Sequence, residues 1–211
     1  MLYVLDLDDT LILERDFVSS GFRAVDAWLA AHTVITGFYD TAWALFQEGL
    51  RGIIFNQVLE RSGCRYQPGL IDQMVNVYRN HRPEIALLPD AEEFLKRSGR
   101  DNTALITDGY PEIQWNKIDA LGLQQYIDNI VVTGDWGRAF WKPHTRAFVH
   151  VSREHSSHEC MYIGDNPEKD FIAPRKLGWA TSVRVKRLMS LHYDLPTPSH
   201  CTQMSSLCNI L

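Results

Sequence analysis

The sequence predicts an α/β fold in which a doubly wound parallel sheet carries an inserted α-helical domain. Three observations support this prediction. Short apolar runs rich in β-favouring residues alternate with helical patterns through the second half of the chain. A long block with helical periodicity separates the first of these runs from the others. Polar and acidic residues directly follow several of the runs, as in loops at the carboxyl edge of a parallel sheet.

The first expected strand is the wholly apolar run at residues 2–5, which leads into an acidic loop at residues 6–10. A run that is apolar on both faces is typical of a strand buried in a parallel sheet. From about residue 14 to residue 82, apolar residues instead recur at helical spacing, in stripes interrupted by glycines. We interpret these stripes as core packing of a domain inserted after the first strand.

After this block, strands and helices alternate. Further strands are expected at residues 103–106, 130–132, 160–163 and 181–185. One intervening helix is bounded by Pro111 and Gly122, residues that favour a helix start and a helix stop. Asp90 with Glu93 resembles a capping box at the start of another helix. Pro174 falls inside the last expected helix, where an interior proline costs about 3 kcal/mol unless the helix bends.

These elements divide the chain into three parts. A discontinuous Rossmann-like core is expected at residues 1–13 and 84–187, and a helical cap at residues 14–83. A tail follows at residues 188–211, in which Asp194 is the only formal charge and no period is visible. We expect the tail to lie over the core, with contact with a partner as the alternative.

Composition narrows the class of protein. The 211 residues include 21 Lys and Arg against 26 Asp and Glu, a net charge of −5, which argues against broad contact with nucleic acid polymers or an anionic membrane. Four cysteines without Cys-x-x-Cys spacing favour a reducing cytoplasm. No apolar run is long enough to span a bilayer, and the acidic loop begins too early for a leader to precede it. Oligomeric state is left open.

Chemically active side chains follow several of the predicted strands. Asp6 and Asp8 follow the first, Thr107 ends the second, Lys142 comes a loop after the third, and Asp165 follows the fourth. Because ligands bind outside the carboxyl ends of parallel strands, we expect these groups to share one cavity. Clustered carboxylates raise each other's proton affinity, which a hard cation such as Mg²⁺ relieves. A cation, an ammonium and a hydroxyl together indicate a phosphoryl site.

These residues resemble the four ordered motifs of the haloacid dehalogenase (HAD) superfamily. The motifs here are Asp6-Leu7-Asp8-Asp9-Thr10, Thr107, Lys142, and Gly164-Asp165 followed by Asp170. The resemblance covers essentially residues 1–185, and the position of the helical block resembles the C1-type cap subgroup. It implies a Mg²⁺-dependent phosphomonoesterase that forms an aspartyl-phosphate intermediate. A cap favours a small phosphorylated metabolite, such as a sugar phosphate or a nucleotide, because closure excludes bulk water.

The resemblance also implies a role for each matching residue. Asp6 would be the nucleophile, and Asp8 the general acid and then the base. Thr107 and Lys142 would hold the phosphoryl oxygens. Asp165 would bind Mg²⁺ together with the Asp6 carboxylate and the Asp8 backbone carbonyl.

Seven further residues are expected to contribute to this site. Asp170 and Asn166 would contact the metal ligands, or reach the metal through a water molecule, without binding the metal directly. The backbone N–H groups of Asp108 and Gly109 would approach the phosphate. Substrate specificity is expected from Arg15, Phe17 and Arg51, for each of which ordinary packing or solvation is the alternative.

Three other functions remain open at this point. A phosphomutase would share every motif and differ in the cap. A metal-independent haloacid dehalogenase would use Asp6 but would need neither a metal nor an acid at Asp8. A receiver-type signalling module also combines aspartates, a threonine and a lysine at strand ends, although such modules are shorter and lack an inserted cap.

Overall fold

The computed structural model of the chain describes residues 1–63 and 66–210, so Cys64, one of the four cysteines considered above, lies outside the described residues. The chain forms two compact units. One consists of Met1–Arg15 with Ile85–Leu211, and the other of Asp16–Glu84. In this division the tail belongs to the first unit, which contains the sheet. None of the described helices is long and apolar enough to cross a lipid bilayer.

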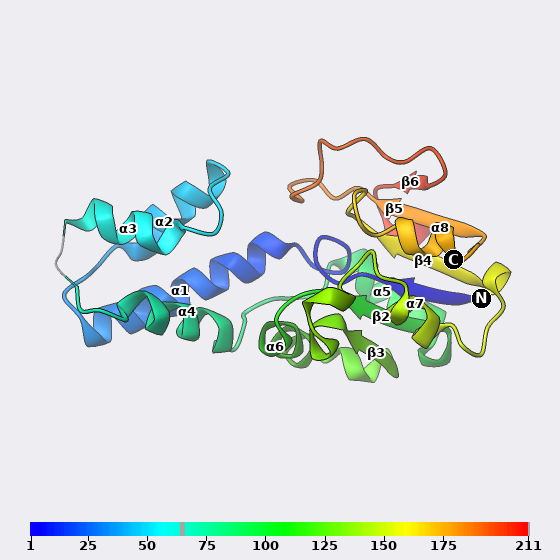
Figure 1. The fold of residues 1–211 in the computed structure, drawn as a ribbon, viewed down its shortest axis with the longest axis horizontal. Helices are drawn as coiled ribbons and strands as arrows, with labels where there is room; N and C mark the ends of the chain where they lie inside the picture. Colours follow the sequence, from blue (N-terminus) through cyan, green and yellow to red (C-terminus); the bar gives the residue numbers. More distant parts are fainter. Residues whose placement is uncertain (64–65, 211) are drawn as a thin grey trace. The chain divides into compact units, whose positions relative to one another are not determined.

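The sheet unit is built around a parallel sheet, which has six strands within the described residues, in the order β3-β2-β1-β4-β5-β6 (Figure 1). The strands are β1 (Leu2–Leu5), β2 (Thr103–Thr107), β3 (Asn129–Val132), β4 (Cys160–Gly164), β5 (Thr181–Val185) and β6 (Thr202–Met204). The first five are the strands that the sequence predicts. The sixth lies in the tail, where no period indicated it.

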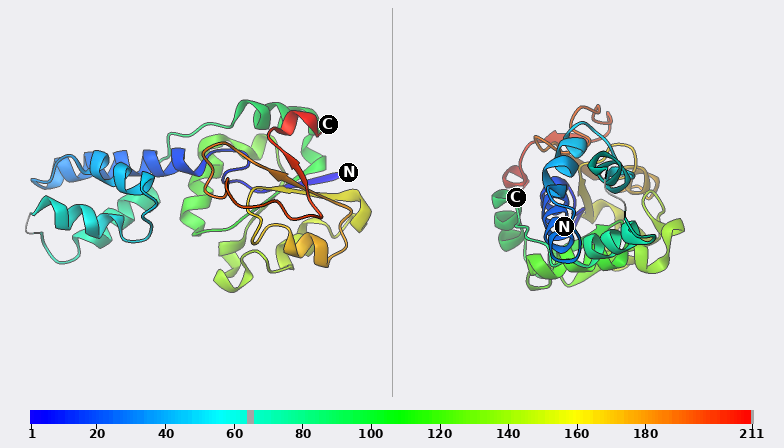
Figure 2. Two further views of the ribbon diagram at one scale, coloured as in Figure 1. Left: turned by 90° about the horizontal axis from the view of Figure 1, so that it is seen from above. Right: turned by 90° about the vertical axis from the view of Figure 1, so that its left-hand side faces the viewer.

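Helices cover both faces of this sheet, which confirms the doubly wound fold. Helices α5 (Pro89–Ser98) and α6 (Pro111–Leu121) pack on one face, where Leu105 of β2 joins the core. Helices α7 (Arg146–Val151) and α8 (Ile172–Lys176) pack on the other face, with Ala104 and Ile106. Figure 2 shows α5 and α8 on opposite sides of the sheet. Alternate residues of β2 thus point into two apolar layers.

Two helix starts differ from the sequence prediction. Helix α5 begins at Pro89 with Leu88 as its N-cap, so Asp90 lies inside the first turn and the predicted capping box is wrong. Proline suits this first position because its missing N–H has no partner within the helix there. Helix α8 begins only at Ile172, so Pro174 also lies in a first turn. The helix therefore accommodates Pro174 without the loss of an internal hydrogen bond.

The tail lies on the sheet unit and is held there by arginine. Arg187 donates to the Asp90 carboxylate at 2.6 Å and to the Thr10 carbonyl at 2.9 Å. Asp90 also accepts the backbone N–H of Leu207 at 2.8 Å. The aspartate that we expected to cap α5 therefore fixes the end of the chain instead.

The other unit is helical, and a cluster of aromatic rings lies within its apolar core. Its helices are α1 (Glu14–His32), α2 (Phe38–Gln47), α3 (Ile54–Ser62) and α4 (Leu70–Asn80). At its centre the ring of Phe22 lies 5.9–6.3 Å from four other rings, those of Phe38, Phe46, Phe55 and Tyr78. The helical stripes of the sequence are thus core packing.

Candidate active site

The pairing of β1 with its neighbours gathers the chemically active loops at one edge of the sheet. Leu5, the last residue of β1, is paired with Leu105 of β2 and with Ile163 of β4. Asp6 therefore emerges between the ends of β2 and β4, and Thr107 closes β2 with only 1% of its surface exposed. The strand order reverses between β1 and β4, the place where open α/β sheets bind ligands.

A buried ammonium group joins two of the predicted carboxylates. Lys142 Nζ lies 2.6 Å from Asp6 Oδ1 and 2.8 Å from Asp170 Oδ1. It also donates to the hydroxyl of Tyr162 on β4 at 3.1 Å. The Lys142 and Asp170 side chains are wholly inaccessible to solvent. These contacts unite the first, third and fourth motifs of the sequence in one cluster.

The charges in this cluster do not balance. Burial raises the pKa of Asp6 to about 8, against the lowering effect of Lys142 and with the help of Asp170. Burial also disfavours the charged form of Lys142, but Asp170 and Asp6 outweigh it and hold the pKa of Lys142 well above its ordinary value. The pKa of Asp170 is lowered, because Lys142 and Lys169 outweigh the effect of burial. A single shared ammonium thus satisfies Asp170 and leaves Asp6 short of positive charge.

The donor set fits a divalent metal ion. Carboxylate oxygens of Asp6, Asp165 and Asp170 all lie within 4.8 Å of one another. Three carboxylates against the charge of Lys142 leave an excess of about two negative charges, and oxygen ligands of this kind suit Mg²⁺. A hard cation would supply the positive charge that Asp6 lacks.

Asp108 connects three loops through its side chain. Its Oδ1 accepts the hydroxyl of Thr133 at 2.7 Å and the backbone N–H of Lys142 at 3.0 Å. Its Oδ2 lies 3.2 Å from Lys169 Nζ. The sequence predicted a backbone role for Asp108 and Gly109, and did not indicate this bracing of the Lys142 loop. At Gly109 a Cβ atom would lie 2.6 Å from Gln114 Nε2, so glycine permits a close approach there.

Asp8 is held by two residues of α6 that sequence reasoning missed. Lys117 Nζ lies 2.7 Å and 2.8 Å from the two Asp8 oxygens, and Gln114 donates to Oδ2 at 3.2 Å. Both α6 side chains are buried, and they lie one turn apart on the same helix face. This spacing was visible in the sequence, but nothing in the sequence pointed that face of α6 at the first motif.

The turn after β4 places Asp170 and Asn166. The backbone N–H of Asn166 donates to Asp170 Oδ2 at 2.9 Å. A Cβ atom on Gly164 would lie only 2.5 Å from the same oxygen. Gly164 therefore allows the Asp170 carboxylate to fold back against the end of β4 and reach Lys142.

The tail contributes a histidine to the site, a second feature that sequence reasoning missed. His192 Nδ1 lies 2.9 Å from Asp165 Oδ2, and Nε2 lies 3.0 Å from Asn166 Nδ2. Burial raises the pKa of Asp165, and the hydrogen bond from His192 opposes that rise. Beside it, Asp9 Oδ2 accepts the backbone N–H of Leu191 at 2.9 Å. His192 lies only seven positions beyond Val185, the last residue of β5, but no motif in the sequence marked it.

The three predicted specificity residues are divided between the two units. Arg15 is the last residue of the first segment of the sheet unit. Within the helical unit, Phe17 is buried with its ring centre 5.6 Å from that of Tyr78. Arg51 Nη1 donates to the carbonyls of Phe46 and Leu50, each at 2.7 Å. Phe17 and Arg51 thus have packing contacts inside their own unit, and their specificity roles stay predictions.

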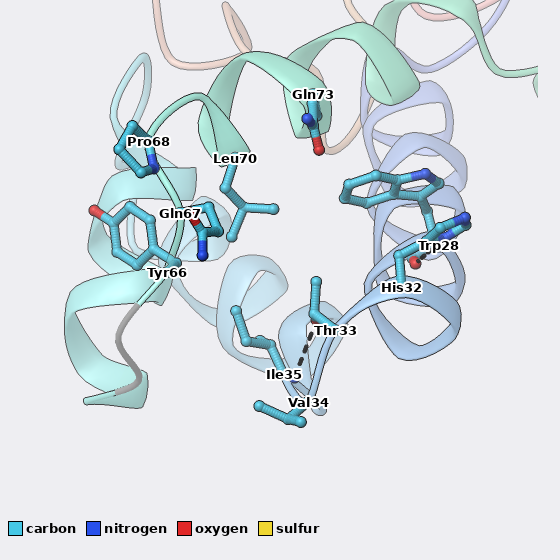
Figure 3. A pocket seen from close by; sticks show the side chains of 10 residues that line it. All are labelled: Trp28, His32, Thr33, Val34, Ile35, Tyr66, Gln67, Pro68, Leu70 and Gln73. Carbon is cyan, nitrogen blue, oxygen red and sulfur yellow. Dashed lines mark hydrogen bonds between the residues drawn. The ribbon is translucent and has the colours of Figure 1, made fainter.

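A separate pocket of about 410 Å³ lies within the helical unit (Figure 3). It is lined by Trp28, His32, Thr33, Val34, Ile35, Tyr66, Gln67, Pro68, Leu70 and Gln73. The backbone N–H of Ile35 donates to the Thr33 hydroxyl on its wall at 3.1 Å. Among the described residues that line it, none is a lysine, an arginine or a carboxylate, in contrast to the cluster at the sheet edge.

Comparisons with known proteins agree on one family. The model of the haloacid dehalogenase-like hydrolases matches residues 1–178. A glyceraldehyde 3-phosphate phosphatase of Methanocaldococcus jannaschii is 26% identical over 190 residues, which cover 83% of this chain and 81% of the relative. A phosphoserine phosphatase of Thermus thermophilus is 29% identical over 141 residues, covering 65% of this chain and 54% of the relative.

Solved structures share the fold. The HAD-hydrolase YfnB of Bacillus subtilis, solved with bound magnesium, superposes with a TM-score of 0.66 at 18% identity, covering 99% of this chain and 96% of that one. The L-2-haloacid dehalogenase of Xanthobacter autotrophicus gives a TM-score of 0.60 at 16% identity, covering 100% and 97%. At these identities the likeness shows the architecture alone.

Proposed function

The chain belongs to the haloacid dehalogenase-like hydrolases, and we propose that within this family it is a Mg²⁺-dependent phosphomonoesterase acting on a small phosphorylated metabolite. The observation that carries the proposal is the buried Lys142 between Asp6 and Asp170, with Asp165 within 4.8 Å of both carboxylates. The relatives named above support it, because both are named as phosphatases of small phosphomonoesters. A sugar phosphate or a nucleotide is of the same chemical class.

In the first step of the proposed reaction, an oxygen of the Asp6 carboxylate attacks phosphorus. The new bond from Asp6 to phosphorus forms while the bond to the leaving oxygen breaks, and Asp8 gives that oxygen a proton. Lys142 and Thr107 hold the phosphoryl oxygens. When bound, Mg²⁺ supplies positive charge against the phosphoryl oxygens and the carboxylates of Asp6 and Asp165.

In the second step, water hydrolyses the aspartyl phosphate. Asp8 takes a proton from the water, whose oxygen attacks phosphorus, and the bond from phosphorus to Asp6 breaks to release inorganic phosphate. Lys117 and Gln114 contact the Asp8 side chain and hold it in position for this step. The same two partners fix its position for the first step.

A phosphatase screen tests the proposal. The substrates are glyceraldehyde 3-phosphate, phosphoserine, a hexose phosphate, nucleotides and p-nitrophenyl phosphate, each with Mg²⁺ and with EDTA. We expect phosphate release that EDTA abolishes and that Asp6→Asn lowers by a factor on the order of 10⁴ or more, because the nucleophile is lost. Asp101→Asn is the matched control, since Asp101 is an exposed aspartate of the same unit, and it should retain full activity.

The same screen separates the alternatives. Chloride release from 2-chloropropionate in EDTA would identify a dehalogenase and contradict the proposal. Turnover that requires a bisphosphate activator would identify a phosphomutase. Stoichiometric phosphorylation of Asp6 without release would identify a receiver-type module. Our proposed location is the cytoplasm, on the cysteine content of the sequence.

A further inference from the structure

The connection between β5 and β6 crosses the active edge of the sheet. It comprises residues 186–201, an unusually long stretch without a regular helix or strand, and such connections are often functional. Its histidine, His192, contacts Asp165 and Asn166 of the fourth motif. Asp6 and Asp165 are the two carboxylates that would bind the metal in the proposed function; Lys142 pairs with Asp6, whereas His192 pairs with Asp165.

Hydrogen bonds define the orientation of the His192 ring. The side-chain Oδ1 of Asn166 accepts the backbone N–H of Glu168 at 2.9 Å, so its amide nitrogen must face His192. That amide donates to Nε2, which makes Nε2 the acceptor in the neutral ring. The proton of the neutral ring is therefore on Nδ1, which donates to Asp165 Oδ2 at 2.9 Å.

The backbone that carries His192 is fixed to the backbone that carries Asp165. Arg184 of β5 is 1% exposed, and its Nε donates to the Asp165 carbonyl at 2.9 Å. Its Nη2 donates to the His192 carbonyl at 2.6 Å. One buried guanidinium thus sets the distance between the two residues. The bond from Leu191 N–H to Asp9 holds the segment from the other side.

We propose that His192 is a positioning residue for the metal site, holding Asp165 through Oδ2 so that the carboxylate is oriented before the cation binds. Metal ligands are commonly fixed by such partners, whose removal typically costs about 10–100-fold in metal affinity. The hydrogen bond leaves the second carboxylate oxygen of Asp165 for the cation. This inference rests on the metal dependence in the proposed function, and it assigns part of the active site to the tail.

Binding of Mn²⁺ to the full chain, followed by electron paramagnetic resonance, tests this role without a substrate. We expect His192→Ala to weaken Mn²⁺ binding about 10-fold or more. His192→Asn carries an amide nitrogen in place of Nδ1, and we expect it to recover most of the affinity. The matched control is His200→Ala, since His200 is an exposed histidine of the same tail, and it should bind Mn²⁺ as the wild type does.

The outcomes distinguish this inference from the proposed function. If the wild type and Asp165→Asn bind Mn²⁺ equally, the proposed metal site itself is wrong. If Asp165→Asn loses binding but His192→Ala stays within twofold of the wild type, only the positioning role is wrong. A nitrogen coupling to bound Mn²⁺ that disappears in His192→Ala would identify His192 as a direct ligand and also overturn the positioning role. Thermal unfolding of each variant verifies that it is folded.

Discussion

The two units bury opposite kinds of side chain. In the helical unit the described core is apolar, with aliphatic side chains around a cluster of aromatic rings, and Ser20 is the one buried polar residue among those described. The sheet unit also has an apolar core, but in addition it buries aspartates, lysines and arginines. The buried charges gather at the carboxyl edge, around Asp6, Lys142 and Asp165.

The buried charges of the sheet unit form the candidate active site, whereas the buried side chains of the helical unit stabilise its packing. A buried charge is costly unless it is paired, so a set of them persists only in a site that uses or compensates them. An apolar core, in contrast, stabilises the fold through the surface area that it removes from water. Substitutions at the charged site should therefore change activity as well as stability, whereas substitutions in the helical core should change stability alone. The following predictions test that contrast.

The largest effect is expected at Lys142. Lys142→Met leaves Asp6 and Asp170 buried without their shared cation, so phosphatase activity should fall by a factor on the order of 10³ or more. The free energy of unfolding at pH 8 should fall by about 3–5 kcal/mol. Phosphate release and urea unfolding measure the two effects.

Lys96→Met is the matched control for this change. Lys96 also pairs with a carboxylate, that of Glu92 at 2.5 Å, but the Lys96 side chain is 57% exposed. Surface pairs of this kind contribute little, so the free energy of unfolding should change by less than about 0.5 kcal/mol. Equal losses in the two variants would show that burial does not make the Lys142 pairs special.

A purely structural effect is expected at Phe38 in the helical unit. Phe38 is fully buried, so Phe38→Ala should lower the free energy of unfolding by about 3–4 kcal/mol. Mn²⁺ affinity should remain within twofold, because the candidate ligands lie in the sheet unit. Val34→Ala, at a residue 87% exposed, is the control and should change stability by less than about 0.5 kcal/mol.

The smallest effect is a dependence on pH at Asp9. Burial raises the pKa of Asp9 to about 7 from an ordinary value of 3.8. Between these values the folded chain retains a proton that the unfolded chain releases, so the stability of the metal-free protein should fall as pH rises through this window. Asp9→Asn removes that titration.

Urea unfolding in EDTA at pH 5 and pH 8 measures this difference. The fall in the free energy of unfolding should be smaller in Asp9→Asn than in the wild type, by a difference on the order of 1–2 kcal/mol. Asp101→Asn, whose side chain is exposed, should keep the wild-type slope. Identical slopes in all three proteins would contradict the raised pKa of Asp9.

Much of the fold was predictable because its signals are local. The first five strands are apolar runs that end in polar residues, and the helical block shows its period directly in the sequence. The start of α5 was not predictable in the same way. Asp90 has the residue type of a cap, yet Pro89 takes the first helical position and Asp90 pairs with Arg187, 97 residues away.

The residues of the site also divide into those that local sequence signals identify and those that only long-range contacts reveal. Asp6, Asp8, Thr107, Lys142 and Asp165 were identified from their order after predicted strands, and the structure brings them to one edge, where their catalytic roles stay predictions. Lys117 and His192 have no motif of their own. Each reaches an aspartate through a contact between distant segments, which one sequence does not encode as a local pattern.

The sequence by itself determined the fold class, the insertion and the residues of the motifs, because side-chain periodicity and strand-end chemistry are properties of neighbours along the chain. Only the tertiary structure decided which partners hold those residues. The tail, which shows no period in the sequence, is attached to the sheet because β6 pairs with β5. The Arg184 guanidinium binds the carbonyls of both Asp165 and His192 and so holds these two residues together. Such contacts form because buried polar groups must find partners wherever the folded chain supplies them.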